Sequence, residues 1–156
     1  MVDNIRSVGA SNIILAPGSE QGQSESVLLT QGSKLLKGRS NLVFDLHAYE
    51  KWFREPQTSV EARIKKLQSL GFAPLFREVS PKNSSELMKP SPFLKAAQST
   101  GTSVCAWLWK YDSNDPDAIL RADKRSNDHN NNGWGSLYRS FISSKRLTRK
   151  WFGISC

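Results

Sequence analysis

Four short apolar runs, each preceded by a glycine, constrain the fold of this chain most strongly. The glycines recur about every thirty residues, the length of one strand plus a crossover helix. Each glycine stands where a helix needs a left-handed residue to end, and the run behind it is short enough for a buried parallel strand. The pattern therefore predicts an α/β fold. The glycines and their runs are Gly9 with 12–16, Gly38 with 42–47, Gly71 with 74–79, and Gly101 with 103–109.

One helix between these runs is predicted clearly. Residues 58–61, Thr-Ser-Val-Glu, form a capping-box pattern. Val60, Ile64 and Leu67 then follow at helical spacing before Gly71 ends the segment.

The remaining connections are predicted from their start and composition. Ser91 as N-cap and Pro92 at the first helical position predict a second helix, and residues 135–142 predict a third, aromatic one. Residues 17–35 are rich in glycine and serine, so we expect a long loop there, with a short helix at 33–37.

Length and charge limit the classes of protein that fit. A chain of 156 residues can form one domain with a core, but a complete eight-unit barrel needs ~250 residues. The net charge of +8 is spread along the chain except for one basic cluster, which a solvated terminal helix explains as well as a nucleic-acid partner does. We expect no nucleic-acid partner. The cluster consists of Lys145, Arg146, Arg149 and Lys150.

Other site types have little support in the sequence. Cys105 and Cys156 form neither a disulfide framework nor a metal site, so both are predicted to be free thiols, and no cofactor or metal is expected. No apolar run approaches the ~20 residues of a membrane span, so no membrane partner is expected. The first residues also lack the apolar stretch of a secretory signal.

Reactive side chains gather at the ends of three of the four runs. The carboxyl ends of parallel strands meet at one edge of a sheet, where functional groups collect. We therefore expect a single pocket that receives a carboxylate, an imidazole, a phenol and an indole. By strand alternation, one face each is shared by Asp45, His47 and Tyr49, by Phe76 and Glu78, and by Trp107 and Trp109.

A glycosidase would explain a carboxylate at the end of an apolar strand. Such a group costs several kcal/mol to desolvate, and in a glycosidase it attacks the anomeric carbon. Each residue also has a structural alternative. Glu78 could form a strand-end salt bridge, His47 could be a hydrogen-bonded structural residue, and Tyr49 and the tryptophans could belong to the core or its wall.

These residues resemble glycoside hydrolase family 5, the cellulase and mannanase family of (β/α)8 or TIM barrels, and most closely its endoglucanase-like members. The similar stretches look like the fifth to eighth strand units. The resemblance thus implies that residues 1–156 form a single partial catalytic domain, a half-barrel. The stretches are residues 5–18, 41–49 (Asn-Leu-Val-Phe-Asp-Leu-His-Ala-Tyr), 74–80 (Pro-Leu-Phe-Arg-Glu-Val-Ser), 106–112 and 133–138.

The resemblance also implies roles for the candidate residues. Glu78 falls on the catalytic nucleophile of the family, and His47 and Tyr49 fall on its His-x-Tyr pair, whose tyrosine hydrogen-bonds the nucleophile. Trp109, ahead of Trp107, falls on the indole that lines the subsite next to the scissile bond. The family retains the anomeric configuration, with its two carboxyl groups ~5 Å apart.

Two departures from the family pattern stand out. The acid/base glutamate of the fourth strand and a supporting arginine near the first strand have no counterpart here, and Glu20 and Glu25 lie in a polar loop unsuited to replace the acid. Arg77 occupies a position where the family usually has a small residue. Alternation predicts that its side chain points away from Glu78, toward the helices.

The sequence therefore predicts part of a retaining β-1,4-glycanase that acts on cellulose-type glucan ahead of mannan. We expect little or no hydrolysis by this chain, an extracellular parent enzyme, and self-association through the open barrel edge. A non-catalytic carbohydrate-binding or interaction module is the main alternative, and a small basic nucleic-acid binder is a third.

Overall fold

A four-stranded parallel sheet lies at the centre of the computed structural model, which describes residues 1–83 and 86–145. Neighbouring strands all pair in parallel, which confirms the predicted α/β class. A two-stranded antiparallel pair, β4 (Lys82–Asn83) and β5 (Glu86–Leu87), follows the third strand. The sheet order is β1 (Ile14–Pro17), β2 (Leu42–Ala48), β3 (Pro74–Val79) and β6 (Ser103–Ala106).

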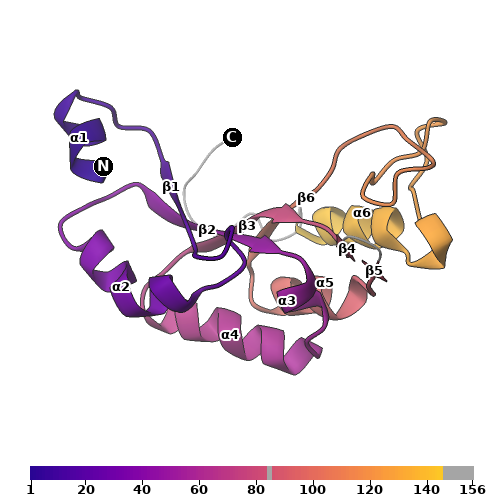
Figure 1. Ribbon diagram of the computed structural model, residues 1–156, viewed down its shortest axis with the longest axis horizontal. Coiled ribbons are helices and arrows are strands. Elements are labelled where there is room, and N and C mark those ends of the chain that lie inside the picture. Colours follow the sequence, from indigo (N-terminus) through magenta and orange to yellow (C-terminus); the bar gives the residue numbers. More distant parts are fainter. Residues whose placement is uncertain (84–85, 146–156) are drawn as a thin grey trace.

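Helices connect the parallel strands and cover one side of the sheet (Figure 1). Helices α2, α3, α4 and α5 lie on this side, while α1 precedes β1 and α6 packs against α5. Within the described residues, none of the helices that connect the strands lies on the other side of the sheet. The helices are α1 (Val2–Ser7), α2 (Ser26–Leu36), α3 (Glu50–Phe53), α4 (Gln57–Ser69), α5 (Ser91–Ser99) and α6 (Trp134–Lys145), with a 3-10 turn, η1, at His129–Asn131.

The four glycines of the sequence pattern end helices as predicted. All four have positive φ angles, between 69° and 82°. A Cβ atom at any of them would meet nothing within 4 Å, so the left-handed backbone, and not lack of space, is what requires glycine there.

Helix α4 is confirmed, but its predicted capping box is wrong. The N-cap is Pro56, and no side chain caps the helix. Pro56 has the extended conformation of an N-cap residue, so the helix begins at Gln57, before the expected serine and threonine. Glu61 instead accepts hydrogen bonds from Gln57 Nε2 at 2.8 Å and from Ser99 Oγ at 2.7 Å.

Two other helix predictions also need correction. Helix α2 covers 26–36, although a loop with a short helix at 33–37 was predicted. Its glycine and serine residues are typical of a loop, but its leucines form an apolar face that packs against the core. Helix α5 begins at Ser91 itself, with Pro90 as its N-cap. Helix α6 confirms the predicted aromatic helix.

The hydrophobic core lies between the sheet and the helices on its covered side. Phe76 of β3 packs edge-on against Trp52, at 4.8 Å between ring centroids, and against Phe93 of α5, at 5.0 Å. Val60 and Ile64 of α4 are completely buried in the same cluster. The described part of the chain contains no helix long and apolar enough to cross a membrane.

Replacing Ile64 by alanine tests the importance of this one-sided core. The Ile64→Ala variant should lose about 2–5 kcal/mol of unfolding free energy, because the side chain has no exposure and leaves a cavity. Lys65→Ala is the matched control, since it removes a mostly exposed side chain from the next position of the helix, together with an ion pair to Glu61 that contributes at most about 0.5 kcal/mol. Urea denaturation measures both, and equal losses would contradict this account of the core.

Candidate functional site

Strand β2 places Asp45 and His47 on the uncovered side of the sheet. Phe44, Leu46 and Ala48 alternate with them and are buried against the helices. This confirms the alternation predicted for Asp45 and His47. Tyr49 follows directly after the strand.

Strand β3 contains a β-bulge at Arg77. His47 pairs with Glu78 although Leu46 pairs with Phe76, so β3 has one more residue than β2 at this point. The pairing with β6 has the same irregularity between Phe76 and Val79. The bulge directs both Arg77 and Glu78 to the uncovered side, while Phe76 and Val79 remain buried among the helices.

Two predictions about this strand are therefore wrong. Phe76 and Glu78 do not share a face, because the extra residue interrupts the alternation between them. Arg77 does not point toward the helices, because its side chain contacts Asp45 and His47 on the uncovered side.

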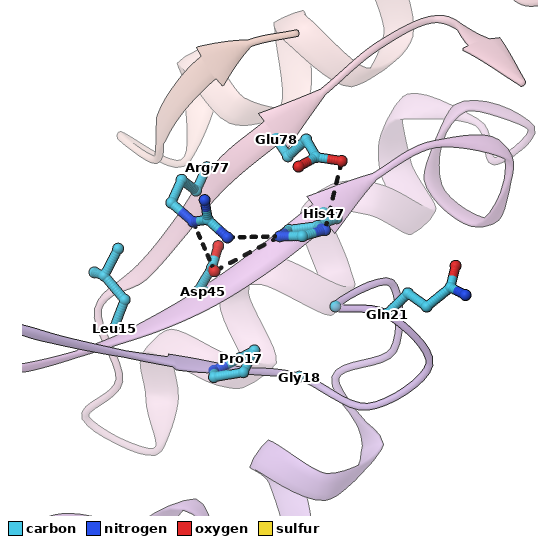
Figure 2. A pocket seen from close by; sticks show the side chains of 9 residues that line it. Leu15, Pro17, Gly18, Gln21, Asp45, His47, Arg77 and Glu78 are labelled. Carbon is cyan, nitrogen blue, oxygen red and sulfur yellow. Dashed lines mark hydrogen bonds and ion pairs between the residues drawn. The ribbon is translucent and has the colours of Figure 1, made fainter. Parts of the chain in front are cut away.

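The four polar side chains from β2 and β3 lie in one cavity of about 670 Å³ (Figure 2). His47 is central: its Nδ1 lies 3.8 Å from Glu78 Oε1, and its Nε2 lies 3.6 Å from Asp45 Oδ2. Arg77 Nε donates to Asp45 Oδ2 at 2.8 Å. The cavity is lined by Leu15, Pro17, Gly18, Gln21, Gly22, Asp45, His47, Arg77 and Glu78.

Tyr49 hydrogen-bonds Glu78, although it is not among the residues that line the cavity. Its hydroxyl donates to Glu78 Oε1 at 2.6 Å. Burial, together with this hydrogen bond to a carboxylate, raises the pKa of the Tyr49 phenol well above its ordinary value. The phenol therefore stays protonated and acts as a donor. A carboxylate, an imidazole and a phenol are thus brought together as predicted.

A turn between β1 and α2 lies over the imidazole. The backbone N–H of His47 donates to Gly22 O at 2.9 Å, and a Cβ atom on Gly22 would lie 2.8 Å from His47 Cγ. Trp52 Nε1 donates to Gln23 O at 2.9 Å, which fixes the turn to α3. The Arg63 guanidinium lies 3.5 Å from the centre of the Trp52 ring, a cation–π contact that helps to hold the ring in place.

The two loop glutamates are held in ion pairs. Glu25 accepts two hydrogen bonds from Arg63, each at 2.7 Å, and Glu20 pairs with Lys51. Burial alone would raise the pKa of Glu25, but the paired guanidinium outweighs it, and the net shift is downward. A carboxyl group with this shift is a poor proton donor, in line with its exclusion as the acid.

The tryptophans are not among the residues that line the cavity of Glu78. Trp107 extends the β3–β6 pairing, since its N–H donates to Val79 O at 2.7 Å, and its side chain is 46% exposed. Trp109 follows the end of β6 and lines a separate groove of about 320 Å³ together with Tyr111 and residues of α6. The predicted single pocket therefore contains no indole within the described chain, and the roles of both tryptophans remain predictions.

The structure adds two residues to the site that sequence reasoning had not placed there. Arg77 was recognised as unusual but was assigned to the wrong side of the sheet. Asp117 was not recognised: it accepts a hydrogen bond from Ser80 Oγ, and burial raises the pKa of its carboxyl group. The negative charge of Asp117 also contributes to the raised pKa of Tyr49. Its only sequence signal was its place in a polar loop after the fourth run.

Cation sites and thiols add little to this picture. Within residues 1–83 and 86–145, no three His, Cys, Asp or Glu side chains are grouped to hold a metal ion. Cys105 is a free, exposed thiol, and Cys156 lies outside the described residues. The basic cluster of 145–150 likewise lies outside the residues whose side chains the structure describes.

Comparisons with known proteins bear on the family and the fold of the chain. Residues 1–113 match the family model for cellulase, glycosyl hydrolase family 5. The structure is similar to a β-mannanase from Streptomyces thermolilacinus, with a TM-score of 0.71 and 17% identity over 90% of this chain and 47% of that one. The same enzyme solved with mannohexaose gives a TM-score of 0.71 and 17% identity over 92% of this chain and 46% of that one.

A mannanase catalytic domain from Streptomyces sp. SirexAA-E gives a TM-score of 0.64 and 19% identity over 77% of this chain and 39% of that one. The chain therefore spans about half the length of the β-mannanase structures that it matches, which is consistent with a partial barrel. No curated protein matches its sequence.

Substitution of Gly22 tests whether the turn positions the imidazole. Gly22 and Gly9 have almost the same φ angle, 83° and 82°, so alanine at either costs about 1–2 kcal/mol of backbone strain. Only at Gly22 would the new methyl group clash with His47, which should lower the unfolding free energy by about 1–3 kcal/mol more and shift the NMR signals of the His47 ring. If Gly9→Ala and Gly22→Ala lose equal stability and leave the ring signals unchanged, the turn does not position His47.

Proposed function

The chain belongs to glycosyl hydrolase family 5, the cellulase family, and we propose that it carries the nucleophile half of a retaining β-1,4-glycanase site. The observation on which this rests is the short hydrogen bond from Tyr49 to Glu78 at the carboxyl end of β3, next to His47. A carboxylate that accepts a hydrogen bond from a protonated phenol in an open cavity is oriented to attack an electrophilic carbon.

The geometry of Glu78 favours one of its two oxygens as the nucleophile. Tyr49 and His47 both face Oε1, and the described part of the chain forms no hydrogen bond to Oε2. In the proposed step Oε2 forms a bond to the anomeric carbon while the bond from that carbon to the leaving oxygen breaks. The leaving oxygen takes a proton from an acid, and water later hydrolyses the glycosyl-enzyme.

The cavity contains no second carboxylate suited to act as this acid among the described residues. Asp45 is the other carboxylate in the lining, but it is buried and hydrogen-bonded to Arg77. We therefore propose that this chain hydrolyses unactivated polysaccharide poorly, because the loss of general acid catalysis costs on the order of 10²–10⁴ in rate.

The proposed substrate is a β-1,4-linked polysaccharide, with cellulose-type glucan ahead of mannan. The similar structures include mannanases, one of them solved with mannohexaose, and this supports testing mannan beside glucan. Such polysaccharides lie outside cells, so we propose that the parent enzyme acts there.

An activated aryl glycoside tests the nucleophile without the missing acid. A dinitrophenyl β-cellobioside or β-mannobioside leaves without protonation, so its burst of dinitrophenol requires the carboxylate alone. The wild-type chain should release dinitrophenol, and Glu78→Gln should release none above the uncatalysed background. Glu86→Gln is the control, because it neutralises an exposed carboxylate that pairs only with Arg54 among the described residues.

A fluorinated glycoside that traps the glycosyl-enzyme gives a second measurement on the same proteins. Peptide mass spectrometry should locate the sugar on Glu78. Release of dinitrophenol by Glu78→Gln at the wild-type rate, or a trapped sugar on another residue, would show that the nucleophile is assigned wrongly.

Carbohydrate binding without hydrolysis is the second candidate function. Trp109 is 64% exposed and Tyr111 is 52% exposed, and both line the groove beside α6, where aromatic faces could pack on sugar rings. For a binding module, Trp109→Ala should abolish retention on insoluble cellulose or mannan, while Glu78→Gln should leave it unchanged.

A further inference from the structure

Arg77 contacts both of the side chains that β2 contributes to the cavity. Its Nε donates to Asp45 Oδ2 at 2.8 Å, and its Nη2 lies 3.2 Å from His47 Nε2 (Figure 2). The bulge in β3 is what brings it there, because a regular strand would direct Arg77 and Glu78 to opposite sides of the sheet.

The contact between Arg77 and His47 restricts where the imidazole proton can be. A guanidinium carries only donors and stays protonated at all ordinary pH values. His47 Nε2 must therefore be the acceptor, and the single proton of the neutral ring must lie on Nδ1. That nitrogen is the one that faces Glu78 Oε1, at 3.8 Å.

Asp45 acts in the opposite direction. Its Oδ2 lies 3.6 Å from the same His47 Nε2, its side chain is almost completely buried, and its Oδ1 has no hydrogen-bond partner in the described structure. A buried carboxylate so close to Nε2 would favour a proton on that nitrogen. Arg77 donates a hydrogen bond to Asp45 Oδ2 and directs a second N–H at His47 Nε2. It therefore opposes a proton on Nε2.

We propose that Arg77 is a positioning residue that holds His47 in the neutral tautomer with its proton on Nδ1, directed at Glu78. The proposal deepens the proposed function and rests on it for the role of Glu78 as nucleophile. In this tautomer His47 presents a partial positive charge to the carboxylate, beside the Tyr49 hydroxyl. In the other tautomer a lone pair of Nδ1 would face Glu78 Oε1 and repel it.

A long-range proton–nitrogen NMR spectrum of the histidine-labelled chain tests the tautomer directly. The chain contains two histidines, His47 and His129, so a His129→Gln variant assigns the signals. At about pH 8 we expect the wild-type His47 to show a protonated Nδ1 and an unprotonated Nε2. A protonated Nε2 in the wild-type chain would overturn the proposal without any variant at Arg77.

Arg77→Met tests the cause. Once the guanidinium is gone, Asp45 should draw a proton to His47 Nε2, and the signal of that nitrogen should change to the protonated form. Arg54→Met is the matched control, because Arg54 pairs with Glu86 on the surface and its loss should leave His47 as in the wild type. Unchanged His129 signals show that Arg77→Met remains folded. An unprotonated Nε2 in folded Arg77→Met would refute the assigned role.

The assignment of the His47 tautomer and the assignment of Glu78 as nucleophile are tested independently of each other. The NMR measurement needs no substrate, whereas the glycosyl-enzyme trap reports only on Glu78. If the Nε2 signal of His47 changes in Arg77→Met as expected but the trap does not label Glu78, the positioning role stands and the proposed function is wrong.

Discussion

The extra residue in β3 sets the direction in which Glu78 points, and the rest of the site depends on that direction. Before the bulge, Phe76 faces the helices and completes an aromatic cluster with Trp52 and Phe93. After it, Val79 faces the helices again. A regular strand would place Glu78 among these apolar side chains, where an unpaired carboxylate costs several kcal/mol. The bulge keeps the core apolar and brings the carboxylate to His47 and Tyr49.

Much of the fold could be predicted from the sequence because its signals are local. A glycine after each helix and a short apolar run behind it specify where a helix ends and a buried strand follows, and these signals located all four parallel strands. Helix α2 was underestimated because Gly32 and its serines resemble a loop, although Gly32 is buried where α2 packs closely on Phe72. The end of α4 was predicted better than its start, since Pro56 displaced the expected cap.

The directions of the side chains were predicted correctly where the strand is regular and incorrectly where it is not. Alternation placed Asp45 and His47 together because β2 has no irregularity before His47, but the same rule failed for Arg77 and Glu78. The sequence did contain a physical signal for this failure. Two consecutive charged residues in an otherwise buried strand cannot both avoid the core unless the strand bulges, because strict alternation would direct one of them into the helix layer.

The polar side chains on the uncovered side of the sheet form most of their hydrogen bonds with one another. Asp45 is paired with Arg77, Arg77 with His47, and Glu78 with Tyr49, each through side chains of β2, β3 or the residue after β2. The arrangement of these groups thus depends on the register of two neighbouring strands and on the turn held over His47, and not on whatever covers the open side of the sheet. A half-barrel can for this reason keep Glu78, His47 and Tyr49 in the arrangement that the proposed nucleophile requires.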